Sequence, residues 1–216
     1  MQKAASKGSL KTLQLLLGRD GNDQHIVSTS LLHAQALDIQ QTVVESGQLG
    51  TLMYLVEQTA SRSNDDPGRF DMYDLSANGN KLLQVACARG HIDIVRYILQ
   101  GDCRAGHVIF ANVDPAVDDN SPLLLACMHG HVSIVRELLR KGPDGKQIYP
   151  AVDAKTRGNL PIKMAAEHGN LEVINFLLPW VVHSLDRDGV ASVEKVLRNE
   201  LDIPKAKENP DFLCGL

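Results

Sequence analysis

One segment of this chain recurs three times at nearly constant spacing. It reads ACARGHIDIVRYIL at residues 86–99, ACMHGHVSIVRELL at 126–139 and AAEHGNLEVINFLL at 165–178. The first two copies are identical at eight of fourteen positions. Such a recurrence predicts a fold made by stacking one unit repeatedly, instead of a fold built around a single centre. A stack of this kind offers an extended surface and seldom a closed chemical pocket.

A glycine marks the same position in each copy and extends the repeat towards the N-terminus. Two weaker copies, at residues 4–17 and 43–56, keep this glycine, a leucine two residues later and the apolar positions that follow. The five glycines lie at intervals of 39, 43, 40 and 39 residues: Gly8, Gly47, Gly90, Gly130 and Gly169. We therefore expect about five units.

The fourth unit carries the residues that point to a known family. Ser121-Pro122-Leu123 resembles the Thr-Pro-Leu box of the ankyrin repeat. The second half of the ankyrin unit is matched by Gly130, His131, Ile134, Val135, Leu138 and Leu139. The resemblance covers about residues 1–178 and is specific over 79–178. It implies an all-α fold, an ankyrin-like solenoid of stacked helix-turn-helix repeats with short β-turn or finger connections.

The chain also departs from the ankyrin pattern. The full Thr-Pro-Leu-His box is intact nowhere, since Lys81-Leu82-Leu83-Gln84 and Leu160-Pro161-Ile162-Lys163 stand in its place. The period is near 40 residues, whereas ankyrin repeats have about 33. We expect the additional residues to lengthen the connections between units.

The recurring residues have a simple interpretation as contacts between neighbouring units. The alanines at 86, 126 and 165 keep the first helix of each unit slim, and the glycines suit a tight turn with positive φ. The resemblance implies that His91 and His131 bind loop backbone. Cys87 and Cys127 occupy one repeat position, so helix packing separates them by roughly 10 Å. That is too far for a disulfide, which needs roughly 6 Å between Cα atoms, and both are interpreted as small buried thiols in a reduced compartment.

The segments between units hold the extra length. Residues 101–120 and 142–159 each contain a short β-prone core, Val108-Ile109-Phe110 in one and Gln147-Ile148-Tyr149 in the other. Both also contain the tetrapeptide PAVD, at 115–118 and 150–153, which predicts the same element twice. We interpret these segments as extended fingers or β-turns at the repeat junctions.

The C-terminal part differs from the repeats, and we divide the chain accordingly. Residues 1–178 are predicted to form ankyrin-like repeats, 179–204 a helical C-terminal cap and 205–216 a tail. Pro179 is expected to end the last repeat helix. The segment 189–202 places five apolar residues on one helical face: Val190, Val193, Val196, Leu197 and Leu201. A helix covering the end of the stack accounts for this pattern, and a partner-binding helix is the alternative.

Candidate binding residues are those that vary between the copies. The two positions before the glycine read Ala88-Arg89, Met128-His129 and Glu167-His168 in the last three units. Arg89, His129 and His168 would form a ladder of cationic or titratable groups, with Met128 and Glu167 beside them, that accepts an acidic or mixed peptide in a pH-dependent way. An ordinary solvated helix face explains the same residues. Ile109, Phe110 and Tyr149 are the candidate anchors on the fingers.

No pattern of catalytic or ligand-binding residues is found. The chain lacks the phosphate-binding, dinucleotide-binding, zinc-protease and hydrolase motifs. Cys127, His129 and His131 resemble a thiol–imidazole set, but Cys127 falls on a core position and His131 on the turn. His129 and His168 lie one unit apart, too far to hold a metal without further ligands. We therefore predict no enzyme, no cofactor and no metal.

We predict a monomeric, non-enzymatic scaffold that binds a partner protein through the concave inner-helix face and the finger loops. A net charge of −4 and a pI near 6.0 argue against nucleic acid. No secretory signal or membrane span is evident, which favours a cytoplasmic protein, with a secreted host-directed effector as another possibility. One alternative is the substrate-recruiting module of a larger effector or regulatory enzyme whose catalytic part lies outside this chain. Another is an assembly spacer that self-associates.

Overall fold

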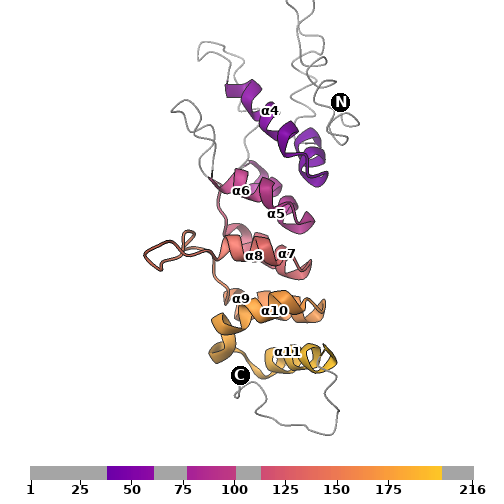
Figure 1. Cartoon of the computed structure of the whole chain (residues 1–216), viewed down its shortest axis with the longest axis vertical. Helices are drawn as coiled ribbons and strands as arrows, with labels where there is room; N and C mark the ends of the chain where they lie inside the picture. The colour runs from indigo at the N-terminus through magenta and orange to yellow at the C-terminus, as the bar shows by residue number, and fades with distance from the viewer. Residues whose placement is uncertain (1–37, 61–76, 101–112, 201–216) are drawn as a thin grey trace, which may run out of the picture. The chain divides into compact units, whose positions relative to one another are not determined.

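The computed structural model describes residues 38–60, 77–100 and 113–200 (Figure 1). The chain divides into two compact units, Met1–Val113 and Asp114–Leu216. In both units the described residues form pairs of antiparallel helices joined by tight turns. The expectation of an all-α fold of helix-turn-helix repeats is confirmed.

The N-terminal unit contains four described helices. They are a helix over residues 38–45, α4 (Leu49–Ala60), α5 (Ala77–Arg89) and α6 (Ile92–Gln100). Apolar residues at helical spacing fill its core, among them Ile39, Val43, Leu52, Leu55, Leu83, Ile94 and Ile98. Because no single helix can bury its apolar stripe alone, the pairs are stable only when packed on their neighbours.

The C-terminal unit contains five described α-helices in two layers. They are α7 (Val117–Met128), α8 (Val132–Leu138), α9 (Thr156–Glu167), α10 (Leu171–Val181) and, after the short 3-10 helix η2 (Val182–Ser184), α11 (Arg187–Glu200). Helices α7, α9 and α11 pack side by side and are called the inner layer; α8 and α10 form the outer layer. Ala126 and Ala165 are fully buried in the inner layer, as expected where small side chains let helices approach closely.

The turn within each helix pair has one hydrogen-bond pattern. The glycine has positive φ at all four described turns, with values of 69° at Gly47, 80° at Gly90, 75° at Gly130 and 70° at Gly169. The N–H of the next residue donates to the carbonyl five residues earlier, as His131 does to Ala126 at 2.9 Å and Asn170 to Ala165 at 2.8 Å. This is a Schellman motif, which favours glycine because the left-handed conformation is strained for other residues.

The residue after the glycine also joins neighbouring helix pairs. His91 Nε2 lies 3.0 Å from the carbonyl oxygen of Glu45, at the end of the preceding pair's first helix. Asn170 Nδ2 donates to the carbonyls of Cys127 and Met128 at 2.9 and 2.8 Å. These bonds satisfy carbonyls that a helix end leaves unpaired. The predicted backbone contact is thus confirmed for His91, and Asn170 makes the equivalent contact in the last pair.

Helices α7 and α9 both begin with a left-handed turn. Three successive residues have positive φ in each: Asp118, Asp119 and Asn120 in α7, and Arg157, Gly158 and Asn159 in α9. The two turns are hydrogen-bonded to each other, since Arg157 Nη2 donates to the Asp118 carbonyl and forms an ion pair with Asp119 at 3.1 Å. A strained backbone of this kind persists only where its surroundings hold it.

The connection between α8 and α9 is a finger, as predicted. Lys141 and Gln147 form an antiparallel β-bridge, and Gly142 N–H donates to the Lys146 carbonyl at 2.7 Å across the tip. Figure 1 shows this finger projecting from the end of the unit at which α8 ends and α9 begins. The other β-prone core, Val108-Ile109-Phe110, lies outside the described residues.

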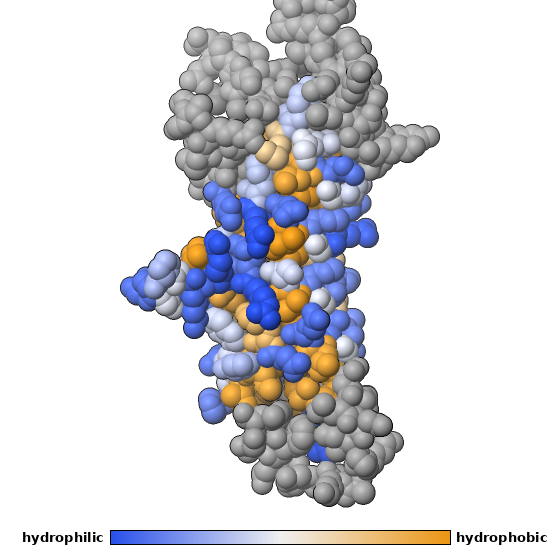
Figure 2. Space-filling model, viewed as in Figure 1, coloured by the Kyte–Doolittle hydropathy of each residue, from blue (hydrophilic) through white to orange (hydrophobic). Residues whose placement is uncertain are grey.

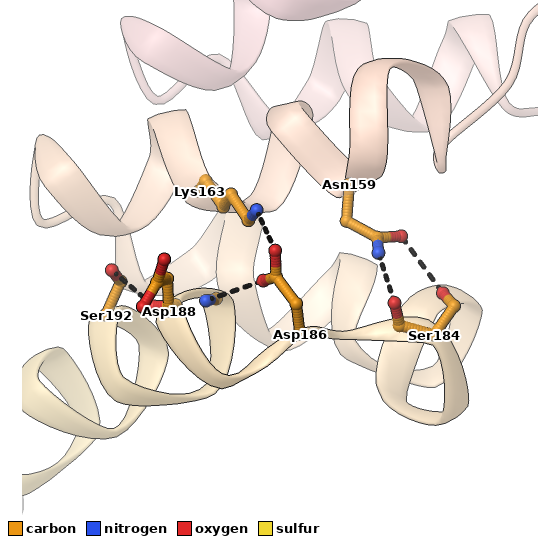
Figure 3. Close-up of polar contacts among 7 residues, drawn as sticks. Asn159, Lys163, Ser184, Asp186, Asp188 and Ser192 are labelled. Carbon is orange, nitrogen blue, oxygen red and sulfur yellow. Dashed lines mark hydrogen bonds and ion pairs between the residues drawn. The ribbon is translucent and has the colours of Figure 1, made fainter.

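Helix α11 packs against α9 and α10. Val193 and Leu197 are buried and Val190 and Val196 half-buried, so the predicted apolar face is the packed face, with Leu201 outside the described residues. Figure 3 shows polar contacts at the start of α11: Lys163 Nζ binds Asp186 Oδ2 at 2.8 Å, and Asp186 Oδ1 accepts the Gly189 N–H at 2.9 Å. Asp186 therefore caps the first turn of α11 while it binds a lysine of α9.

The prediction that Pro179 ends the last repeat helix is wrong, because α10 continues through Pro179 to Val181. A proline lacks the N–H that would bond the carbonyl four residues back, here that of Asn175. Both Asn175 and Pro179 are exposed. Water can bind the freed carbonyl there, so the helix tolerates the proline in its last turn.

Candidate functional site

The inner layer of the C-terminal unit places four predicted binding residues close to one another. Met128 and His129 end α7, while Glu167 and His168 end the neighbouring helix α9. His129, Glu167 and His168 are exposed, and Met128 is half-buried. The four residues thus lie at equivalent ends of two helices that pack against each other.

Hydrogen bonds and ring contacts orient the two histidines. His168 Nδ1 lies 2.9 Å from the Met164 carbonyl oxygen, one turn earlier in α9. The His129 ring stacks on His131, with 6.1 Å between ring centroids. Both imidazoles thus contact their own repeat, although both residues are exposed.

An apolar strip runs beside these polar residues. Leu125, Met128 and Met164 are half-buried, in contrast to Leu123 and Ile162, which are fully buried in the same helices. We call these three residues the inner strip. Methionine side chains adapt to differently shaped partners because they are unbranched and polarizable.

Arg89 belongs to the N-terminal unit. It is the last residue of α5 and its side chain is exposed. It therefore occupies the same position in its helix pair as His129 and His168 do in theirs.

The finger residues lie apart from the inner strip. The finger follows α8 and leads into α9, whereas Glu167 and His168 lie at the other end of α9 (Figure 1). At 1.5 Å per residue, a helix of this length separates its ends by roughly 15 Å or more. A ligand that contacts both regions must run along the helix.

Tyr149 lies at the base of the finger and is half-buried. Burial raises the pKa of Tyr149, with the nearby Glu137 carboxylate acting in the same direction and the nearby Arg140 guanidinium acting against both. Arg140 in turn forms an ion pair with buried Glu137 at 3.4 Å. Tyr149 therefore lies near the charged residues at the end of α8. The two other predicted finger anchors, Ile109 and Phe110, lie outside the described residues.

Sequence reasoning missed Ile148, whose side chain is 42% exposed and is the large apolar side chain most open to solvent in the described part of the chain. Strand alternation could have identified it, because neighbouring residues of an extended segment point to opposite sides. With Tyr149 packed inwards, Ile148 points outwards.

Reactive groups in the described residues are arranged for packing. Cys87 and Cys127 are buried free thiols, as predicted, and burial raises the pKa of both well above its usual range. A thiol with a raised pKa is a poor nucleophile. Among the described residues, no three His, Cys, Asp or Glu side chains are grouped so that they could hold a metal ion.

None of the described helices combines the length and the apolar character that spanning a bilayer requires.

Comparison with known proteins agrees with the repeat geometry. A family model described as ankyrin repeats (3 copies) matches residues 1–107 and 105–184. No curated protein matches the chain. Since the family model covers most of the chain and the described helix pairs have the expected turns, the chain belongs to the ankyrin repeat family, whose repeats generally act as protein-interaction modules and are typically non-catalytic.

Proposed function

We propose that this chain is a non-enzymatic scaffold that binds a segment of a partner protein along the inner-layer surface of its C-terminal unit. The observation that carries the proposal is the inner strip, Leu125, Met128 and Met164, with exposed His129, Glu167 and His168 around it. An apolar centre with a polar rim is the usual composition of a protein interface. The finger residues of the same unit would add contacts for a longer segment.

The repeat architecture supports this use of the surface. The Schellman turns and the Asn170 bonds hold the ends of α7 and α9 in place before any partner arrives. A rigid surface loses little conformational entropy on binding, so more of the contact energy remains as affinity. The domain division proposed from the sequence is consistent with this function, with α11 as the cap of the stack.

The experiment begins with a photo-crosslinking amino acid at His129, which would identify a protein that contacts this surface. Titration calorimetry of that protein would then compare the wild-type chain with a Met128→Ala, His129→Ala, His168→Ala variant. We expect the variant to bind at least about ten-fold more weakly, as for the loss of central contacts in an interface.

The matched control replaces Arg187 and Lys195 by alanine, two exposed residues of α11. This control should bind as the wild type does. Equal affinity of the wild type and the triple variant would show that the partner binds elsewhere.

A further inference from the structure

A groove lies between the two outer-layer helices of the C-terminal unit, apart from the inner strip. Its volume is about 590 Å³, and its lining includes Val132 and Arg136 of α8 with Glu172, Phe176, Pro179 and Trp180 of α10. In the part of Figure 2 where α8 and α10 lie, apolar surface adjoins strongly hydrophilic side chains. The groove is shallow and largely open to solvent.

The helical spacing of the sequence explains why these residues share a surface. Glu172, Phe176 and Pro179-Trp180 are separated by four and three or four residues, which is one helical face. The buried face of α10 is formed instead by Val173, Ile174, Leu177 and Val181. The groove residues are therefore not needed to fill the core.

Two cations lie over two aromatic rings in this region. The Arg136 guanidinium carbon is 4.7 Å from the centroid of the Phe176 ring, and Lys141 Nζ is 4.7 Å from that of Trp180. The two rings are themselves neighbours, with centroids 6.4 Å apart and planes tilted by 47°. Cation–π contacts at these distances orient the rings and the charges. The arrangement is an ordered row of cation, ring, ring and cation.

The charges of this row are not neutralised by carboxylates within the described residues. Arg140 is paired with Glu137 and Lys163 with Asp186. Arg136 and Lys141, in contrast, form no ion pair with any described residue, and both are exposed. Of the six groove residues named above, Glu172 is the one acid. The half-buried rings of Phe176 and Trp180 thus lie between two cations that can bind carboxylates of a ligand.

The composition of the groove selects among classes of ligand. Two cations are too few for a nucleic-acid backbone, which requires a basic stripe, and the whole chain carries a net charge of −4. Paired aromatic rings favour an apolar side chain, and the cations favour carboxylates next to it. We propose that this outer groove binds an acidic segment of a partner protein whose Phe or Leu side chain packs on Phe176 and Trp180.

The chain contains a built-in reporter for this test. Trp180 is its single tryptophan, so tryptophan fluorescence, excited selectively over that of the tyrosines, reports on the groove. The probe is a short synthetic peptide with Asp and Glu residues on both sides of a Phe-Leu pair and without Trp or Tyr. We expect saturable quenching or a spectral shift of Trp180, weaker at high salt because the charges are exposed.

Two control peptides separate the two parts of the proposal. One has lysines in place of the acids, and the other has serines in place of Phe and Leu. Both should bind at least about ten-fold more weakly than the acidic probe, in line with the loss of a charge pair or an apolar anchor. Equal binding of all three peptides would overturn the proposal.

Variants then locate the site. The R136E, K141E double variant of the full chain should lose at least about ten-fold in affinity for the acidic peptide. The control variant R187E, K195E has the same change in net charge on exposed residues of α11 and should bind as the wild type does. Circular dichroism of both variants confirms that they fold alike. A fluorescence response that is unchanged in R136E, K141E, or equally reduced in the control, contradicts the proposal.

The outcome also distinguishes this groove from the inner strip. The Met128→Ala, His129→Ala, His168→Ala variant changes no residue of the groove and should retain peptide binding. If that variant alone lost binding, the peptide would occupy the inner strip, and the outer groove would be excluded while the proposed function stood.

Discussion

The inner layer of the C-terminal unit has two junctions, α7 with α9 and α9 with α11. They share one asparagine hydrogen bond and differ in their second polar contact. At both junctions, a buried asparagine in a left-handed turn is hydrogen-bonded to the backbone of the segment that follows in the stack. Asn120 Oδ1 accepts the Asp153 N–H at 2.9 Å, and Asn159 Nδ2 donates to the Ser184 carbonyl at 2.6 Å. The second contact differs between the junctions. At the first, Asn170 bonds the end of α7; at the second, the Lys163–Asp186 ion pair joins α9 to the start of α11.

The difference indicates how each junction is stabilised. Asn170 makes two part-buried bonds to carbonyls at the end of α7, so losing them leaves polar groups without partners. The Lys163–Asp186 pair is at the surface, where ion pairs contribute little. Helix α11 is therefore held mainly by its apolar face, including Val193 and Leu197, and by Asn159.

The largest expected effect on the free energy of unfolding comes from alanine substitutions at Gly130 and Gly169. The two glycines have the same backbone conformation but different surroundings. A Cβ added at Gly130 would lie 2.7 Å from Asn170 Oδ1, whereas one at Gly169 would meet no atom within 4 Å. We expect Gly169→Ala to lower the free energy of unfolding by about 1–2 kcal/mol through strain alone. Gly130→Ala should cost about 3 kcal/mol, because it also displaces the Asn170 amide from its two hydrogen bonds. Urea denaturation measures both.

A double-mutant cycle tests the cause of that difference. In an Asn170→Ala background the additional cost of Gly130→Ala should vanish, leaving the cost of strain that Gly169→Ala shows. If the two glycine variants were equally destabilised in the wild-type background, the close contact with Asn170 would be irrelevant to stability.

A smaller effect compares the two asparagines directly. Asn159 makes two bonds to Ser184, to its carbonyl at 2.6 Å and from its hydroxyl at 3.0 Å, as Figure 3 shows. The Asn120 side chain bonds Asp153 across its own junction, by accepting the N–H of that residue. We expect Asn159→Ala to cost about 2 kcal/mol and Asn120→Ala about 1 kcal/mol, from the usual net value of one hydrogen bond.

Hydrogen exchange shows where each asparagine acts. Asn159→Ala should reduce amide protection in α11 more than in α7. Asn159→Gly is the control, since it removes the same bonds but relieves the positive φ, and it should be less destabilising than Asn159→Ala. Uniform loss of protection across both helices would contradict a junction-specific role.

The smallest effect is a pH dependence at Asp186. The hydrogen bond from Lys163, and then that from the Gly189 N–H, lowers the pKa of Asp186 from its ordinary value of 3.8. A lowered pKa in the folded state contributes stability above pH 3.8, and this contribution is lost as the pH falls through the lowered value. Asp186→Asn should therefore have a lower Tm than the wild type at pH 7.

The difference in Tm between wild type and Asp186→Asn should shrink as the pH falls below 3.8. Lys163→Ala provides the control, because it removes the partner but keeps the carboxylate. A difference that stays constant between pH 7 and pH 3 would show that the charge of Asp186 plays no part.

Sequence reasoning was most successful where one residue has one local requirement. The glycines mark the turns because a positive φ is required there, and Cys87 and Cys127 are buried because they share the core position of the repeat. The apolar face of residues 189–202 likewise followed from helical spacing, and Val193 and Leu197 are buried.

The two copies of the PAVD tetrapeptide do not occupy equivalent positions in the structure. Asp118 ends the first copy two residues before Asn120 and lies in the left-handed turn, whereas Asp153 ends the second copy six residues before Asn159 and precedes α9. The equivalent of Asp153 is Asp114, since each accepts the N–H two residues later. Four identical residues are too few to align two repeats when the asparagine hydrogen bonds determine where the left-handed turn lies.

The sequence by itself determined the repeating unit of this protein: its period, its turns, its slim first helices and its membership of a family. These features depend on contacts within one repeat or on residues that recur from repeat to repeat. The tertiary structure decided which of the residues that differ between repeats lie in contact. Arg136, Lys141, Phe176 and Trp180 come from two helices and a finger, and they meet because stacking brings residues about 40 positions apart into contact. Helical spacing within one segment cannot reveal such a meeting, since it depends on the register between units.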